Sequence, residues 1–313
     1  MIKLRASAGA DVVIDAEDAT VSDGVRSPEA TPLVCAEVKA AAVEGFDLEG
    51  EGSKLRQIFV DSWRSRDLVI MLSRKDFFVR YRRASFGLLW AVGLPAFQAL
   101  VLAVVFSRLI RFQTSVPYGV FVFAGITPWS YFNSSISSAA TSIVDGQSLA
   151  TKVYFPRAIL PFVVIGANFI AFLPAVLVLV AFALVSGVSI GWHIFLLIPA
   201  TLVMLLLTAA FSLVLSAAHV YFRDVRYVVA ASLIAWMYAT PVIYPINQMH
   251  GVIRTVININ PATGMVELFR EAVGVHDPGW AAALPWTFVW MGGLLLVAAI
   301  LHRRFDRVFV DLL

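Results

Sequence analysis

The 313-residue sequence has few charged residues and a single cysteine. Charged side chains make up 14% of it and hydrophobic ones 59%, whereas soluble domains carry about 25% charged residues. Because Cys35 is alone, an intramolecular disulfide and a metal site built on several cysteines are excluded. The composition indicates an integral membrane protein instead of a soluble enzyme.

Two further kinds of site have little support. The nucleotide-binding loop GxxxxGK followed by Ser or Thr does not occur, and the segment GEGSK at 50–54 resembles it only superficially. If ATP powers this protein, a second polypeptide therefore has to bind it. His193 and His219 fall at the ends of apolar stretches, where their ring tips are easily solvated, so we expect neither to be a ligand and expect no metal site.

Long stretches without Asp, Glu, Lys or Arg occupy most of the chain after residue 83. They are 84–107, 112–144, 158–222, 227–253 and 278–302. A membrane span needs about 20 residues without unpaired charge. The third stretch, with 65 residues, is long enough for two spans with a turn at 187–193.

The expected fold is therefore an all-α polytopic membrane protein with six transmembrane helices. The expected spans are about 86–107, 118–136, 159–185, 194–220, 227–243 and 281–301.

Short helices are expected beside these spans. Residues 55–83 mix basic and bulky apolar side chains, which predicts an N-terminal amphipathic interface helix. Leu68, Leu72 and Phe78 would share one of its faces. Residues 245–279 are too apolar for a solvated loop and too broken by Pro and Gly for a plain span, so we expect two short re-entrant outer helices there. A basic flank that only sets topology and a surface-lying outer helix are the alternatives.

Charge divides the chain near residue 53. Residues 1–53 contain eleven acidic and four basic residues without a sustained apolar pattern, which predicts an acidic, disordered cytoplasmic tail. Residues 54–313, the expected transmembrane domain, contain ten acidic and twenty basic residues. With the N-terminus inside, sixteen of these bases fall in inner segments and four in outer ones. Both termini are therefore expected in the cytoplasm, with the chain in the plasma membrane.

Acidic residues offer little for chemistry within the membrane. No Asp or Glu after residue 53 falls in an expected span, which disfavours a proton-coupled carrier. Glu267 and Glu271 lie four positions apart and could serve as a general acid and base. We favour ion pairs with Arg270 and Arg254 at the outer interface.

Six short segments, in chain order, resemble those of the ABC-2 type membrane subunits that export lipid-linked polysaccharides such as O-antigen, capsule, teichoic acid and mycobacterial galactan. The segments are FFVRYRRASFGLLW at 77–90, FVFAGITPW at 121–129, TKVYFPR at 151–157, YFRDV at 221–225, TPVIYP at 240–245 and NPATGMVELFR at 260–270. The resemblance covers about residues 55–310, and it says nothing about residues 1–53.

The resemblance implies a homodimer of this chain in the inner membrane, joined to two copies of a separate ATPase subunit. ATP and Mg²⁺ then bind the partner, and this chain binds no cofactor and no nucleic acid. The segment between the second and third spans resembles a coupling helix that docks on the ATPase, supported by the next cytoplasmic turn. The residues concerned are Ser148, Leu149, Lys152, Val153, Tyr154, Phe155, Pro156, Arg157, Arg223 and Asp224.

Arginine and aromatic residues are the candidates for contact with such a substrate. Arg80, Arg82 and Arg83 lie at the cytoplasmic membrane surface, where guanidinium groups bind pyrophosphate oxygens. Attraction to anionic lipids explains them equally well. Sugar rings stack on aromatic side chains, and packing or interface anchoring is the alternative for each aromatic residue. The conduit or gate candidates are Trp129, Tyr131, Trp236, Tyr238 and Tyr244.

We therefore expect a permease subunit of an ATP-driven ABC exporter that moves a polyprenyl-pyrophosphate-linked polysaccharide of the O-antigen, galactan or teichoic-acid type. Such a subunit catalyses no covalent reaction itself. An intramembrane glycosyl or phosphoryl transferase is one alternative, and it would act without ATP or a partner. An ion-coupled carrier is the other, and its transport would stop when the proton gradient collapses.

Overall fold

The computed structural model describes residues 3–5, 11–13, 66–82, 87, 89–109, 112–146, 158–276 and 279–305. The chain separates into two compact units, 1–38 and 39–313. In the first unit, the short strands β1 (Lys3–Arg5) and β2 (Asp11–Val13) pair antiparallel. The described residues of the second unit form helices and turns.

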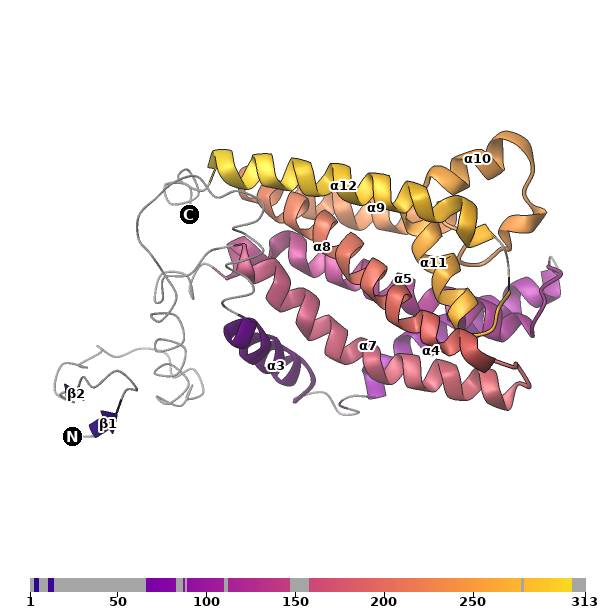
Figure 1. Ribbon diagram of the computed structural model, residues 1–313, viewed down its shortest axis with the longest axis horizontal. Helices are drawn as coiled ribbons and strands as arrows, with labels where there is room; N and C mark the ends of the chain where they lie inside the picture. The colour runs from indigo at the N-terminus through magenta and orange to yellow at the C-terminus, as the bar shows by residue number, and fades with distance from the viewer. Residues whose placement is uncertain are drawn as a thin grey trace. The chain divides into compact units, whose positions relative to one another are not determined.

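Long helices make up most of the second unit (Figure 1). In chain order they are α4 (Leu89–Leu109), α5 (Tyr118–Asp145), α7 (Ile159–Val185), α8 (Leu197–Tyr221, preceded by the 3-10 helix η1, Gly191–Leu196), α9 (Val225–Ala239) and α12 (Gly279–Phe305).

Four described helical stretches are long and apolar enough to cross a membrane: 89–106, 159–185, 191–221 and 279–301. The apolar helix α9 is shorter, with 15 residues. A chain with several such helices is a multi-pass membrane protein, as expected. The count of six spans stays a prediction.

The helix α5 is the centre of the second unit, since 18 of its 28 residues are buried by neighbouring helices. Its second half is rich in serine, which a helix enclosed by protein tolerates better than one that faces lipid. Several of its hydroxyl groups bond to the helix backbone: Thr127 donates to the Phe123 carbonyl at 2.8 Å, and Ser142 to that of Ala139 at 2.7 Å.

The helix α3 (Arg66–Arg82) packs on α7 through Leu68, Leu72 and Phe77. The hydroxyl of Ser73 adds a hydrogen bond to the Val163 carbonyl at 2.9 Å. The predicted face was wrong in part, because Phe78 is 63% exposed. The reason is that α3 has apolar residues on both faces, and only its contact with α7 selects one of them.

Two short helices, α10 (Gly251–Ile259) and α11 (Pro261–Ala272), lie between α9 and α12. Figure 1 shows them at the end of the unit where α7 ends and α8 begins. In α11 every residue except Glu271 is buried, and the helix packs against α12, α5 and α8. The expected pair of short helices is therefore present, while their re-entrance into the bilayer stays a prediction.

Candidate functional site

A polar groove of about 270 Å³ opens between α3, α4, α5 and α7. Its wall combines one guanidinium group with amide, hydroxyl and aromatic side chains. Such a mixture can bind phosphate oxygens and the faces of sugar rings in one place. The polar and aromatic lining residues are Arg80, Tyr81, Trp90, Gln98, Thr127, Ser130, Tyr131, Asn133, Ser134, Asn168 and Phe172.

Of the three candidate arginines, Arg80 lines the groove. Its Nη1 donates to Asn168 Oδ1 at 2.7 Å, and its Nη2 lies 3.1 Å from Asp76 Oδ2. Its side chain remains 39% exposed, so the guanidinium is oriented and still accessible. Arg82 is exposed in the last turn of α3 and does not line the groove, and Arg83 lies outside the described residues.

Tyr131 is the one conduit candidate that lines the groove. Its hydroxyl donates to the Ile165 carbonyl at 3.3 Å, and its ring centroid lies 5.2 Å from that of Phe172. Both contacts come from α7, the helix that also carries Asn168, and they hold the phenol ring in place.

Trp129 and Trp236 pack into an aromatic cluster with Phe132 and Phe211. Their ring centroids lie 6.2 Å apart, and Phe132 and Phe211 lie 5.5 and 5.1 Å from Trp236. The contacts are edge-to-face, a favourable arrangement for aromatic side chains. These two tryptophans connect α5, α8 and α9, and neither lines the polar groove.

Tyr238 and Tyr244 lie on either side of the turn that follows α9. The Tyr244 hydroxyl donates to the Tyr238 carbonyl at 3.2 Å, while the Tyr238 side chain is exposed. Burial raises the pKa of the Tyr244 hydroxyl, an effect that the positive charge of Arg270 opposes. The hydroxyl therefore stays protonated and remains a donor at neutral pH.

A buried ion pair lies where α5, α11 and the turn after α9 meet. Arg270 Nη1 donates to Glu267 Oε1 at 2.7 Å, and both side chains are fully buried. The guanidinium also donates to the carbonyl oxygens of Pro241 and Val242 and lies 3.7 Å from the Phe121 ring centroid. The predicted pairing of Glu267 with Arg270 is confirmed. Protein encloses the pair, and its position at the level of the outer membrane interface stays a prediction.

Arg223 and Asp224 lie in the exposed turn between α8 and α9. The Asp224 carbonyl accepts from the Tyr227 and Val228 amides at 2.9 and 3.2 Å and so begins α9. We expected the His219 ring to be solvated, but the residue is only 5% exposed and is therefore buried. The other coupling candidates, residues 148–157, lie outside the described residues.

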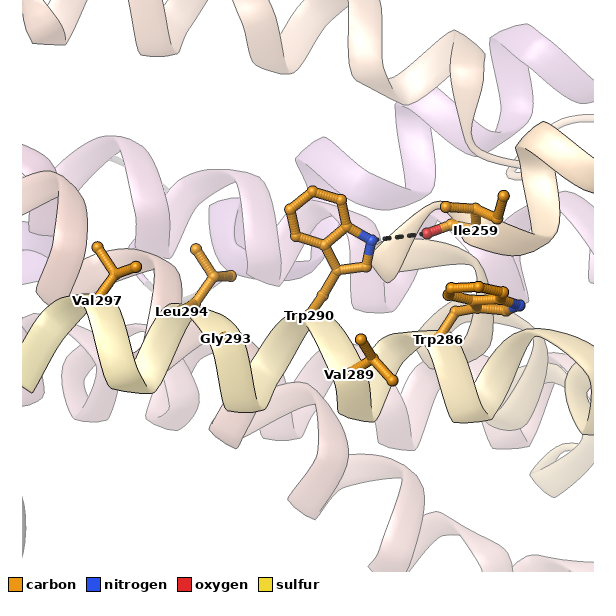
Figure 2. Close-up of a pocket in the computed structure, with 7 residues that line it drawn as sticks. All are labelled: Ile259, Trp286, Val289, Trp290, Gly293, Leu294 and Val297. Atoms are coloured by element: carbon orange, nitrogen blue, oxygen red, sulfur yellow. Dashed lines mark hydrogen bonds between the residues drawn. The ribbon is translucent and has the colours of Figure 1, made fainter.

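A second groove, of about 460 Å³, runs along α12 and is almost wholly apolar. Figure 2 shows Trp286, Val289 and Trp290 along it, with Trp290 Nε1 donating to the Ile259 carbonyl at 2.9 Å. Because its wall offers no charged group and the indole N–H of Trp290 is already bonded, this groove suits an apolar ligand better than a phosphate. The polar groove is the candidate substrate site.

Comparison with known proteins assigns a family to this arrangement. The family model described as ABC-2 type transporter matches residues 67–273, more than half of the chain. The chain belongs to the ABC-2 type transporter family. The O-antigen export system permease protein RfbA of Myxococcus xanthus is 30% identical over 216 residues, which are 68% of this chain and 83% of that protein. A protein of the same name from Klebsiella pneumoniae is 28% identical over 208 residues, which are 66% of this chain and 79% of that protein.

Two of the ABC-2 segments, 240–245 and 260–270, are bonded to each other around the start of α11. Asn260 Oδ1 accepts from the Ala262 amide at 3.0 Å and from Trp236 Nε1 at 2.8 Å. The Asn260 amide donates to Thr240 Oγ1 at 2.9 Å. The network was not predicted, although an Asn followed by Pro is a signal for a helix start and could have located α11.

Proposed function

We propose that this ABC-2 family chain is the permease subunit of an ATP-driven exporter that moves a polyprenyl-pyrophosphate-linked polysaccharide across the plasma membrane. The observation that carries the proposal is its likeness to O-antigen export permeases over 83% and 79% of their length. The glycan is of the O-antigen, galactan or teichoic-acid type.

The polar groove supports this substrate class. The Arg80 guanidinium is oriented by Asn168 and Asp76, and its side chain is still 39% exposed. A pyrophosphate oxygen accepts from such a guanidinium group. Arg80 therefore binds the headgroup, while Asn168 and Tyr131, which are 5% and 3% exposed, form the buried wall behind it.

Energy comes from a separate ATPase subunit, since the sequence has no nucleotide-binding loop. Two copies of this chain and two ATPase subunits form the exporter. Residues 148–157 and the exposed Arg223–Asp224 turn form the docking surface. Six helices cross the plasma membrane, both termini face the cytoplasm, and α10 and α11 form the re-entrant outer element.

Reconstitution into proteoliposomes tests the function. Vesicles that contain this chain and its partner ATPase subunit are expected to hydrolyse ATP faster when the lipid-linked glycan is added and to carry the glycan across the bilayer. Vesicles with either subunit alone are expected to move none. Transport that needs a proton gradient but no ATP would contradict the proposal.

The docking surface has its own test. Replacing Tyr154 and Phe155 together with Glu is expected to abolish substrate-stimulated ATP hydrolysis while membrane insertion is retained, because an apolar docking contact is lost. Val252→Glu is the matched control, since Val252 is 79% exposed on α10. Normal stimulation in the Tyr154 and Phe155 variant would show that the ATPase docks elsewhere.

The transferase alternative fits the structure poorly. A general acid or base must come within hydrogen-bond reach of its substrate. Glu267 is 1% exposed and paired with Arg270, so no substrate can reach it without disruption of the fold.

A further inference from the structure

Three potential metal ligands from two distant parts of the chain come together at one end of the helical unit. They are His193 on η1, Glu271 in the last turn of α11, and His276 in the loop that follows. His276 Nδ1 lies 2.8 Å from Glu271 Oε1, and His193 Nε2 lies 3.8 Å from the same oxygen. The ligand atoms of all three residues lie within 4.8 Å of one another.

The end of α11 holds Glu271 and His276 in a defined geometry. The Val275 amide donates to the Arg270 carbonyl at 3.0 Å, and the Gly274 amide to the Glu271 carbonyl at 3.2 Å. Together with the positive φ of +84° at Gly274, these bonds form a Schellman motif. The two ligands therefore stand on either side of a rigid helix end.

The same motif fixes the distance to His193. A β-carbon on Gly274 would lie 2.9 Å from Val188 Cγ1 and 3.1 Å from the Ser189 carbonyl, so the loop packs closely on the segment that leads into η1. Val188 and Val275 are buried there. On the other side, the Trp192 ring stacks on the His193 imidazole with centroids 4.3 Å apart.

We propose that His193, Glu271 and His276 bind a divalent transition-metal ion of the zinc class. Two imidazole nitrogens and one carboxylate oxygen form a ligand set that Zn²⁺ takes, with water in the fourth position. Ligands of a tetrahedral Zn²⁺ lie about 3.4 Å apart, so small side-chain rotations suffice. Mg²⁺ and Ca²⁺ prefer sets made of oxygen ligands and fit less well.

Burial at the site suits an ion that remains accessible. The side chains of Glu271, His193 and His276 are 13%, 24% and 48% exposed. The carboxylate is therefore shielded, while His276 leaves room for ion entry and for a water ligand.

The bound ion would fasten the connection between α7 and α8 to the end of α11, next to Arg270. The ion would stabilise this end of the protein. This effect would be the same whether or not the transported substrate is bound. From the sequence we expected no metal site, because the only cysteine is Cys35 and because His193 lies at the end of an apolar stretch, and we expected Arg270 and Arg254 to pair with Glu267 and Glu271. In the structure Arg254 is exposed, and Glu271 contacts the two histidines instead.

Metal analysis of the purified full chain tests the proposal. The chain is purified with a tag that contains no histidine, and a chelator removes any metal already bound. ZnCl₂ is then added, and unbound zinc is removed before the measurement. Elemental mass spectrometry is expected to find about one Zn²⁺ per chain, and Zn²⁺ is expected to raise the midpoint of thermal unfolding. His276→Ala and Glu271→Gln are expected to weaken zinc binding by more than about 100-fold, since even second-shell changes cost 10–100-fold.

His250→Ala is the matched control, because His250 is exposed and outside the cluster, and it is expected to bind Zn²⁺ like the parent chain. Because the His276 side chain is half exposed, its loss leaves the fold intact, which an unchanged elution profile verifies. The proposal is overturned if the parent chain retains no zinc, or if His276→Ala retains it equally. An unfolding midpoint of the parent chain that zinc does not change would likewise overturn it.

Discussion

A β-carbon on Gly125 would lie 2.6 Å from Nη2 of Arg270, so the guanidinium fills the space that any other side chain at position 125 would need. The same β-carbon would lie 2.8 Å from the Val242 carbonyl. A glycine in a helix interior costs about 1 kcal/mol relative to alanine, yet Gly125 lies inside α5. The reason is that α11 and the turn after α9 come so close to the α5 backbone here that no larger residue fits.

Gly125→Ala is therefore expected to destabilise the protein by about 1–3 kcal/mol, as overpacking does, despite the better helix propensity of alanine. Thermal unfolding of the purified chain is the measurement. Gly93→Ala is the control, since a β-carbon at Gly93 in α4 would contact nothing within 4 Å. An unfolding midpoint of Gly125→Ala equal to that of the control would refute the close packing.

Glu267→Gln is expected to cost about 3–5 kcal/mol of stability, because it leaves the buried charge of Arg270 uncompensated. Arg270→Lys is expected to be nearly as damaging. An ammonium group cannot reproduce the planar fork that bonds Glu267 and two carbonyl oxygens at once. Yield and unfolding midpoint of the detergent-solubilised chain report both effects. Arg254→Lys on the exposed face of α10 is the control, and equal midpoints for Arg270→Lys and this control would contradict the assigned role.

Arg80→Gln is expected to reduce stimulation of ATP hydrolysis by the lipid-linked glycan about tenfold, the worth of one charged hydrogen bond. Arg74→Gln removes the same charge from an exposed position of α3 outside the groove. It is expected to leave stimulation nearly unchanged. Equal losses in the two variants would mean that the helix attracts lipid phosphates by its net charge alone.

The orientation of the chain can be checked by cysteine labelling in intact cells after Cys35→Ser. Lys152→Cys and Arg223→Cys are expected to react only after the membrane is opened. Val252→Cys on α10 is expected to react with an impermeant reagent from outside. Reaction of the first two from outside would invert the proposed topology.

Local patterns made several features predictable. The turn expected at 187–193 lies between α7 and α8 and includes the start of η1, and Gly187 and Gly191 both adopt positive φ there. The charge-free stretches contain the apolar helices because unpaired charge cannot enter lipid. The six short segments were sufficient to recognise the ABC-2 family, which the match over 67–273 confirms.

Other features could not be derived in this way. Apolar periodicity did not distinguish the two faces of α3, and an aromatic residue in a span looks the same whether it packs, like Trp129, or lines a groove, like Tyr131. The reason is that a periodic pattern records how polar a helix face is, and not which neighbour covers it.

Read alone, the amino-acid order determined that the chain is a helical, multi-pass membrane protein, because charge and hydropathy act on each segment separately. Its resemblance to the ABC-2 family came from the six short segments. Tertiary structure alone decided that Glu267 and Arg270 are enclosed by protein, that Arg80 meets Asn168, and that His193 meets Glu271 and His276. Those contacts join residues up to 88 positions apart, and they form only where close packing of helices brings distant side chains within reach.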